Sequence, residues 1–299
     1  YKNSIKIHLI GAKIMKGIIL TAGNATRLRP ITDCYGKVLV PIYDKPMIDY
    51  GVSLLLGAGI DEIAIVCNRK DYKTFKELFS NKIYKGKIKL FVQKQALGTA
   101  HAIKYAKKFV KDDDFVLLFG DNIFVMKDMS TLLKQAISEN QGMTLFAKQV
   151  SDPQRFGVVE FDKDYKIIGI EEKPSQPKTN YAAVGLYVCD NAAMSAIESM
   201  QISPRGEYEF TDVIQDYVKN GKAKVCVLPD ECKYLDTGTF DSLLDCSVLV
   251  KEFEKENGLL GCKELELYKS GKITEQEFKE AISHYAKDYK SRIESSLKI

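Results

Sequence analysis

Along the first half of the chain, short continuous apolar runs alternate with stretches in which apolar residues recur at helical spacing. Short runs rich in β-branched and aromatic residues have the length and composition of buried strands. The stretches between these runs carry apolar residues at helical spacing. Such alternation is typical of β-α units built around a parallel sheet. We therefore expect an open, doubly wound α/β sheet with strands at 16–20, 62–67, 87–93 and 115–120 and helices at 47–59, 71–80 and 98–110.

From about residue 142 the pattern becomes richer in strands. No internal repeat, low-complexity tract or Gly/Ser-rich linker separates the two halves. The second region is therefore expected to pack onto the same sheet. It should add strands at 143–150, 157–162, 165–174 and 181–189, followed by helices at 191–200 and 211–221.

The end of the chain turns helical again. Thr274 and Glu277 have the spacing of a capping box, which marks the start of a helix. An apolar stripe at helical spacing follows, made of Phe278, Ile282, Tyr285, Tyr289 and Ile293. A terminal helix docked on the domain and a contact between subunits both remain open. The chain thus divides into an N-terminal extension (1–14), a main domain (15–245) and a C-terminal helical segment (246–299).

Residues 1–14 precede the first predicted strand. They have no initiating methionine, too short an apolar stretch for a secretory signal and no small-residue cleavage pattern. We expect Met15 to be the natural start and the residues before it to be foreign or upstream sequence. A functional arm is the alternative.

Composition and charge narrow the possible partners. The 299 residues are 45% hydrophobic, enough for a large core. The net charge is +4, but the first 14 residues contribute three lysines and no acid, so the remainder carries only +1. This charge gives no argument for binding nucleic acid or a membrane surface. No apolar run approaches the ~18 residues of a membrane span.

The cysteines and histidines give no sign of a metal site. Seven cysteines include no C-x-x-C pair, and several lie inside apolar runs, which favours buried, reduced thiols in a cytoplasmic protein. His8, His101 and His284 are scattered without metal-ligand spacing. A zinc site is therefore not expected.

The loop after the first strand, "LTAGNATRLRP" (20–30), could hold phosphates. Small residues let backbone N–H groups approach phosphate oxygens, and Arg27 and Lys37 add positive charge. The spacing fits neither the P-loop nor the dinucleotide fingerprint, because the further glycines are absent. A plain strand-to-helix turn is the alternative. The small residues in question are Gly23, Asn24, Ala25 and Thr26.

Two aspartates follow predicted strand ends. Asp121 lies in "LFGDN" and Asp236 in "YLDTGT". Converging carboxylates could hold Mg²⁺, which prefers oxygen ligands and often shares them with substrate phosphates. Each aspartate alone could instead cap a turn. The segment "IEEKP" (170–174) is weak evidence by itself, because charged strand ends are usually solvated.

Eight motifs taken together resemble the sugar-1-phosphate nucleotidyltransferases, with the glucose-1-phosphate thymidylyltransferases as nearest relatives. They are "TRLRPIT", "KVLVPIYDKPM", "FGDNIF", "FGVVEFD", "IEEKP", "NYAAVGLYVCDN", "RGEYEFTD" and "YLDTGTFDSL", in order from residue 26 to 243. The resemblance extends from Met15 to at least residue 275. It implies a Rossmann-like fold with a mixed, mostly parallel sheet flanked by helices and a C-terminal helical appendage.

The resemblance also implies a role for particular residues. Catalysis would depend on Arg27, Lys37, Asp121, Lys173 and Asp236, and the two aspartates would hold Mg²⁺. The nucleotide would be bound by Gly23, Asn24, Ala25, Thr26, Arg27, Gln93, Gly98 and Asp121. The sugar phosphate would be bound by Gly157, Glu172, Lys173, Arg205 and the backbone at Val184 and 185. His101 would be structural.

The implied reaction joins a nucleoside triphosphate and a hexose 1-phosphate. The sugar phosphate would attack the α-phosphorus of dTTP, giving dTDP-glucose and pyrophosphate. Use of UTP or a modified hexose 1-phosphate stays open, as does a catalytically idle paralogue. The family resemblance further implies a homo-oligomer, a dimer of dimers.

Departures from the family pattern bear on specificity and on regulation. Ala25 stands where a glycine is usual and would be strained by about 1 kcal/mol if its φ is positive. Phe156, Val184 and Tyr234 replace Tyr, Thr and Trp at positions expected to line the sugar pocket. Residues 125–129 depart from the family near its regulatory site, so feedback control is left open.

Overall fold

The computed structural model describes residues 14–23 and 25–297. Within this part of the chain, nine strands form one sheet with β10-β9-β11-β6-β1-β4-β5 as its main path. β8 pairs with β11, and β12 pairs with β8. The strands are β1 Met15–Leu20, β4 Ile63–Asn68, β5 Ile88–Gln93, β6 Asp114–Phe119, β8 Met143–Gln149, β9 Gly157–Phe161, β10 Ile167–Glu172, β11 Tyr181–Cys189 and β12 Ala223–Val227.

The sheet is mixed, as the sequence predicted. β1 runs parallel to both β4 and β6, and β4 runs parallel to β5. β11 is antiparallel to β6, β8 and β9 and therefore joins the second half of the chain to the first. The expected packing of both halves on one sheet is confirmed. Two small ribbons lie off this sheet, β2 Pro41–Ile42 with β3 Lys45–Pro46 and β7 Asn122–Val125 with β13 Lys233–Asp236.

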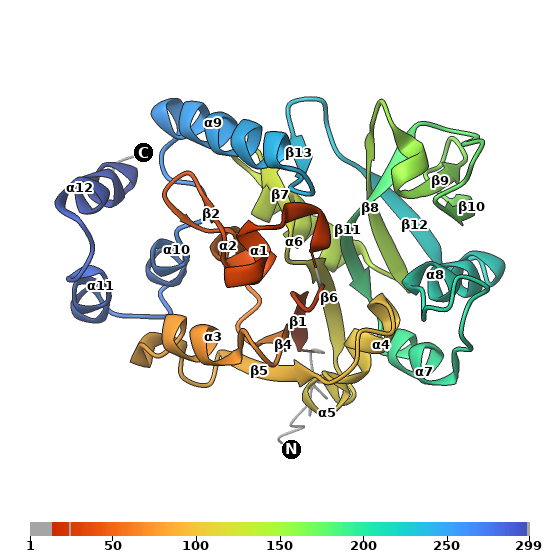
Figure 1. Cartoon of the computed structure of the whole chain (residues 1–299), viewed down its shortest axis with the longest axis horizontal. Coiled ribbons are helices and arrows are strands. Elements are labelled where there is room, and N and C mark those ends of the chain that lie inside the picture. The colour runs from red at the N-terminus through yellow and green to blue at the C-terminus, as the bar shows by residue number, and fades with distance from the viewer. Residues whose placement is uncertain (1–13, 24, 298–299) are drawn as a thin grey trace, which may run out of the picture.

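Helices cover both faces of the sheet (Figure 1). Successive strand residues point to opposite faces, so Ile19 and Leu118 enter one hydrophobic core while Ile18 and Leu117 enter the other. The first core takes side chains from α2 Met47–Gly57, α3 Tyr72–Leu78, α6 Met129–Glu139, α9 Phe240–Asn257, α10 Lys263–Lys269, α11 Glu275–Ile282 and α12 Lys287–Ser296. The second takes them from α4 Thr99–Lys104, α5 Lys107–Val110, α7 Ala192–Ser199 and α8 Phe210–Lys219.

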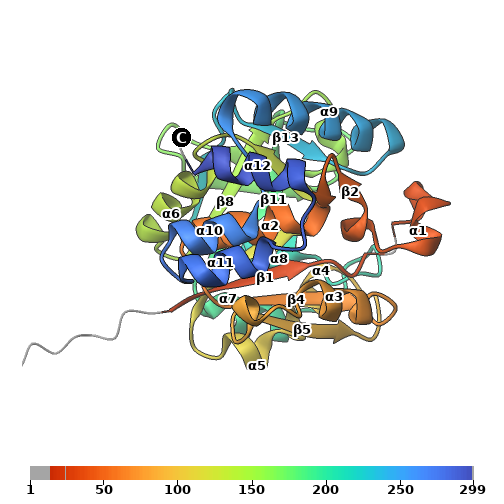
Figure 2. The same cartoon turned by 90° about the vertical axis from the view of Figure 1, so that its left-hand side faces the viewer.

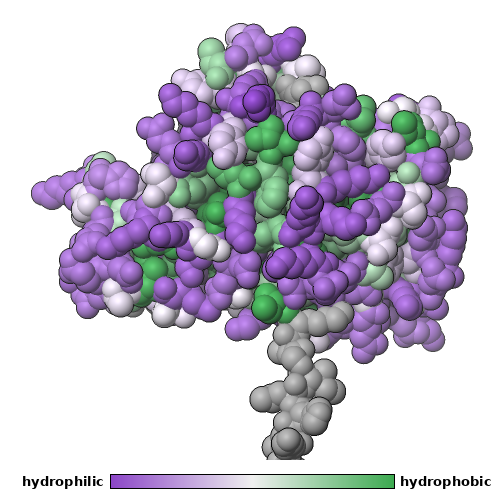
Figure 3. All heavy atoms as spheres, turned by 90° about the horizontal axis from the view of Figure 1, so that it is seen from below, coloured by the Kyte–Doolittle hydropathy of each residue, from purple (hydrophilic) through white to green (hydrophobic). Residues whose placement is uncertain are grey.

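Single-turn elements complete the described part of the chain. They are η1 Thr26–Leu28, α1 Ile31–Cys34, η2 Lys37–Leu39, η3 Lys82–Tyr84 and η4 Pro153–Arg155. The face seen from below in Figure 1 is mainly hydrophilic, with hydrophobic side chains gathered near its centre (Figure 3).

Two helix predictions need correction. The segment 98–110 is two helices, α4 and α5, because the chain leaves the α-helix at Tyr105–Ala106. The apolar stripe that begins at Phe278 also spans two helices, because Ala286 is extended between α11 and α12. The capping box of Thr274 and Glu277 is confirmed.

The C-terminal helices are docked on the domain, next to α2 (Figure 2). Lys263 Nζ lies 2.7 Å from Asp49 Oδ2 of α2 and 3.2 Å from Glu264 Oε1, and all three side chains are buried. Tyr285 OH donates to Glu264 at 2.7 Å. The docked interpretation therefore holds for this stripe, and residue 245 falls inside the continuous helix α9.

A second ion-pair cluster joins α9 and α12 to the β2–β3 ribbon. Lys45 Nζ lies 3.0 Å from Glu254 Oε1. Arg292 Nη1 lies 2.7 Å from Asp44 Oδ2, and Arg292 also pairs with Glu254. The end of the chain thus packs against the segment that follows Lys37.

All seven cysteines are free thiols. Five are buried and Cys226 is half-buried, as expected, but Cys34 is exposed on the short helix α1. None of the helices in residues 14–23 and 25–297 is long and apolar enough to cross a membrane.

Candidate active site

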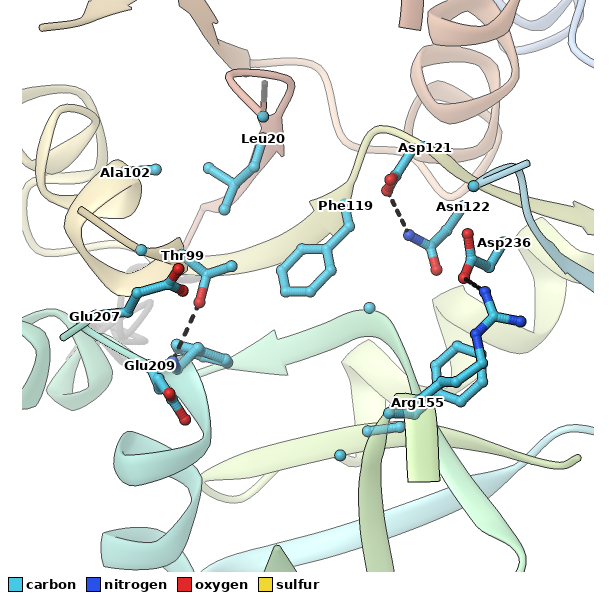
Figure 4. A pocket seen from close by; sticks show the side chains of 18 of the residues that line it. Leu20, Thr99, Ala102, Phe119, Asp121, Asn122, Arg155, Glu207, Glu209 and Asp236 are labelled. Atoms are coloured by element: carbon cyan, nitrogen blue, oxygen red, sulfur yellow. Dashed lines mark hydrogen bonds and ion pairs between the residues drawn. The ribbon is translucent and has the colours of Figure 1, made fainter. Parts of the chain in front are cut away.

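A cleft of about 910 Å³ opens at the carboxyl ends of β1, β5 and β6 and extends across to β9, β10 and β11 (Figure 4). Ligands of open α/β sheets bind at this edge. Asn24 lies outside the described residues. The cleft is lined by nearly all the residues predicted for it: Gly23, Ala25, Thr26, Arg27, Lys37, Gln93, Gly98, Asp121, Gly157, Glu172, Lys173, Arg205 and Asp236.

The phosphate loop turns sharply at Ala25. This residue has φ 46° and ψ 40°, in the left-handed region, so the strain anticipated for a side chain here is present. Its carbonyl oxygen accepts hydrogen bonds from Leu28 N–H at 3.1 Å and from Thr32 Oγ1 at 2.8 Å. These two bonds hold the turn in place without the glycine that is usual at this position.

Lys37 lies between the two predicted metal ligands. Its Nζ is 2.6 Å from Asp121 Oδ2 and 4.0 Å from Asp236 Oδ1. The carboxylates meet because β13 pairs antiparallel with β7, with Asp236 opposite Asn122. Sequence spacing alone could not show this pairing, since 115 positions separate the two aspartates.

A chain of hydrogen bonds orients Asp121. Tyr234 OH donates to Asn122 Oδ1 at 2.5 Å, and Asn122 Nδ2 donates to Asp121 Oδ1 at 2.8 Å. Burial raises the pKa of Tyr234, so its hydroxyl stays protonated and remains a donor. Tyr234 therefore acts on the carboxylate through Asn122.

The donor set fits Mg²⁺. Asp121 and Asp236 offer hard carboxylate oxygens at one end of the cleft, open to the phosphate loop. The part of the chain that the structure describes contains no cluster of three or more His, Cys, Asp or Glu side chains able to hold a metal. Further ligands would have to be water and substrate phosphate, which is how Mg²⁺ usually binds.

Arg155, which sequence reasoning missed, faces Asp236 from the opposite wall (Figure 4). Its Nη2 lies 2.8 Å from Asp236 Oδ2 and its Nη1 lies 2.8 Å from Asp152 Oδ2. The hydrogen bond to Asp152 and the charge of Asp236 raise the pKa of the guanidinium. The sequence did offer one signal for Arg155, because this residue directly precedes the "FGVVEFD" motif.

The wall that was predicted to bind the sugar phosphate, called the sugar-phosphate wall below, is organised around Glu172. Thr211 Oγ1 donates to Glu172 Oε2 at 2.7 Å. Lys173 Nζ lies 3.5 Å from Glu172 Oε1, and Arg205 Nη1 lies 3.8 Å from the same oxygen. Lys173 adopts φ 47°, and its N–H donates to Phe156 O at 2.9 Å. Two cations and one carboxylate thus face the cleft together.

The Val184 side chain does not line the cleft as expected. It is fully buried in the first core, while Ala183, Gly185 and Tyr187 line the cleft. Side chains alternate along β11, so the side chain at 184 points away from the cleft. The replacement of Thr by Val at 184 therefore removes no hydroxyl from the cleft, whereas Phe156 and Tyr234 do line it. A role of the backbone at 184–185 stays a prediction.

The predicted base-binding loop packs tightly against the segment before α8. Tyr208 N–H donates to Leu97 O at 2.8 Å, and Ala100 N–H donates to Tyr208 O at 3.0 Å. Gly98, at φ 108°, lies so close that a Cβ there would be 2.5 Å from Tyr208 O. The buried Gln93 side chain lies with its Nε2 3.5 Å from His101 Nδ1.

The turn at Ala25, the paired carboxylates and the wall around Glu172 meet in one α/β cleft, an arrangement that suits an enzyme transferring nucleotidyl groups. The nucleotidyl transferase family model matches residues 16–252, and the chain belongs to this family.

Two proteins of similar sequence carry the same name. The glucose-1-phosphate thymidylyltransferase of Neisseria meningitidis is 38% identical over 276 residues, which cover 92% of this chain and 96% of that protein. The enzyme of the same name from Mycobacterium tuberculosis is 41% identical over 246 residues, covering 82% and 85%.

Solved structures agree on the fold. A Bacillus anthracis protein assigned as a glucose-1-phosphate thymidylyltransferase, in complex with a sucrose, has a TM-score of 0.72 and 34% identity and covers 79% of this chain and 94% of its own. A UDP-glucose pyrophosphorylase complexed with UDP-glucose has a TM-score of 0.71 at 23% identity, covering 80% and 99%, and supports the fold alone.

Proposed function

We propose that this protein transfers a thymidylyl group from dTTP to glucose 1-phosphate in a Mg²⁺-dependent reaction, giving dTDP-glucose and pyrophosphate. The observation that carries the proposal is the placement of Lys37 against Asp121 and Asp236 in the same cleft as Glu172, Lys173 and Arg205. One wall can hold a nucleoside triphosphate and the other a sugar phosphate.

The chain's own residues position the reactants and balance charge. Arg27 and Lys37 would offset negative charge on the α-phosphate and on the departing pyrophosphate. Lys173 and Arg205 would hold the sugar phosphate so that its oxygen reaches the α-phosphorus in line. Bound Mg²⁺, held by Asp121 and Asp236, would polarise the nucleotide phosphates. Phosphoryl transfer needs no covalent protein nucleophile.

Pyrophosphate release with Mg²⁺ tests this proposal. The purified chain is offered dTTP, UTP, CTP or GTP, each paired with several sugar 1-phosphates. We expect the highest kcat/KM with dTTP and glucose 1-phosphate. A preference for UTP or a modified hexose 1-phosphate would favour those alternatives, and Phe156 and Tyr234 are the pocket residues to exchange next. No release with any pair would identify an idle paralogue.

Assembly and location belong to the same proposal. We expect a homo-oligomer, a dimer of dimers, in the cytoplasm. Three hydrophobic side chains are exposed at four-residue spacing along α9, at Phe240, Leu244 and Val248, which supports a contact between copies. Light scattering of the purified chain tests the oligomer, with a monomeric mass as the contrary result. The free thiols support a reducing compartment.

A further inference from the structure

Both aspartates that fit a divalent cation already contact side-chain cations. Lys37 pairs with Asp121 and approaches Asp236, while Arg155 pairs with Asp236 from the other side. Arg155 is shared with a third carboxylate, Asp152. Any metal that binds both aspartates must compete with these contacts, since the oxygen of Asp236 that faces Arg155 already accepts a charged hydrogen bond.

Arg155 can leave Asp236 without leaving the cleft. It contacts Asp152 and Asp236 through different nitrogens, so Asp152 would retain it in η4 when the Asp236 contact opens. The guanidinium also lies 5.5 Å from the centre of the Phe156 ring. Its side chain is 40% exposed, which leaves room for it to reorient.

The place to which Arg155 can turn is the sugar-phosphate wall. Its neighbour in sequence, Phe156, accepts a backbone hydrogen bond from Lys173 at 2.9 Å, and all three residues line the cleft. The main chain thus ties the segment of Arg155 to the wall that carries Lys173. A guanidinium presents paired donors that match phosphate oxygens.

We propose that Arg155 is a positioning residue that exchanges partners during the reaction cycle: it holds Asp236 while no divalent cation is bound and turns to the phosphate of the incoming sugar when the cation takes Asp236. Only the second partner in this exchange, the phosphate of the sugar, rests on the proposed function. The exchange keeps Asp236 paired with a cation before and after the metal-bound nucleotide enters. It also couples metal binding to capture of the second substrate.

The first test measures Mn²⁺ binding to the full chain without substrates, by electron paramagnetic resonance of free Mn²⁺. Arg155→Gln removes the competitor and should tighten Mn²⁺ binding roughly fivefold, the scale expected for one partly exposed ion pair. Arg155→Lys keeps the charge and should stay nearer to the wild type. Lys178→Gln is the matched control, because it removes one positive charge from an exposed pair with Glu160 near β9, outside the cleft.

The second test separates the two substrates. Arg155→Gln should raise the KM for the sugar phosphate about tenfold and leave the KM for the nucleotide nearly unchanged, with partial rescue in Arg155→Lys. The proposal is overturned if Arg155→Gln binds Mn²⁺ like Lys178→Gln, if no variant binds Mn²⁺, or if the nucleotide KM rises instead. Mn²⁺ binding is measured without either substrate. The first test therefore gives a clear result even if the proposed substrate pair is wrong.

Discussion

The backbone N–H of Gly36 donates a hydrogen bond of 3.1 Å to Asp71 Oδ1, although the two residues are 35 positions apart. Gly36 directly precedes Lys37, and Asp71 is buried before helix α3. A Cβ at position 36 would overlap the carboxylate of Asp71. The start of the turn that carries Lys37 is therefore fixed by close contact with the neighbouring helix.

Gly36→Ala should displace Lys37 from Asp121 and lower kcat by roughly 10²-fold, because small misplacements of catalytic groups have effects of that order.

Asp71→Ala leaves the Gly36 N–H buried without an acceptor and should lower the free energy of unfolding by about 1–3 kcal/mol. Burial raises the pKa of Asp71, so the uncharged Asp71→Asn should be tolerated. Steady-state kinetics and urea unfolding check all three variants, and wild-type turnover in Gly36→Ala would contradict the first expectation.

Arg27 should matter for chemistry as well as for binding. Arg27→Ala is expected to lose roughly 10²-fold in kcat, by analogy with removal of one preorganised donor to a charged transition state. Arg29→Ala is the matched control, because this exposed arginine pairs with Asp33 and does not line the cleft. Pyrophosphate release measures both variants, and equal rates would refute the role of Arg27.

Gly98 should be irreplaceable for a steric reason. Gly98→Ala places a Cβ against the Tyr208 backbone and should raise the nucleotide KM about tenfold or more, because the loop must move. Gly86→Ala is the control for backbone strain. Gly86 also has a positive φ, of 80°, but a Cβ added there would meet no atom within 4 Å. Gly86→Ala should destabilise the fold by about 1 kcal/mol and leave the nucleotide KM alone. A similar KM in both variants would mean that close packing at Tyr208 is unimportant.

His101 should make stability depend on pH in a defined direction. Burial lowers its pKa below the ordinary value of about 6.5, so the unfolded chain takes up a proton before the folded one does. Stability should therefore fall as the pH drops through 6.5 toward the folded pKa and then level off. Urea unfolding between about pH 7.5 and 5 should show this loss in the wild type and a smaller one in His101→Gln. If stability depends on pH in the same way in the wild type and in His101→Gln, His101 does not contribute to this dependence.

Lys263 should be a major contributor to stability. Lys263→Met leaves the buried carboxylates of Asp49 and Glu264 without their cation and should destabilise the fold by about 3–5 kcal/mol. Adding Asp49→Asn should recover part of this loss. Lys272→Met, which breaks an exposed pair with Asp61, should lose no more than about 1 kcal/mol. Equal unfolding midpoints for the Lys263 and Lys272 variants would contradict the expectation.

The sequence predicted the strands well because most of them are buried runs of β-branched residues. The run 181–189 coincides with β11, and the first four strands are displaced by no more than one residue at either end. The ribbon of β7 and β13 was missed because its two strands have four residues each and pair across the chain. Helix breaks at Tyr105 and Ala286 were missed because apolar spacing continues through them.

The candidate site was predictable as a set of residues and not as a set of contacts. Motif order indicated which side chains should meet, and nearly all of them line one cleft. The Val184 side chain was misplaced although β11 alternates regularly, with Ala183 and Tyr187 facing the second core and Val184 facing the first. Arg155 was overlooked because its role depends on a residue 81 positions away.

The pairing of Arg292 with Asp44 makes the segment beside the cleft depend on residues far along the sequence. Asp44 and Lys45 lie a few residues after Lys37, yet the side chains that enclose them belong to α9 and α12. A variant cut before α12 would lose Arg292, the cation that joins Asp44 to Glu254. Such a variant keeps every residue of the cleft, and we expect its activity to fall because the segment after Lys37 loses part of its support.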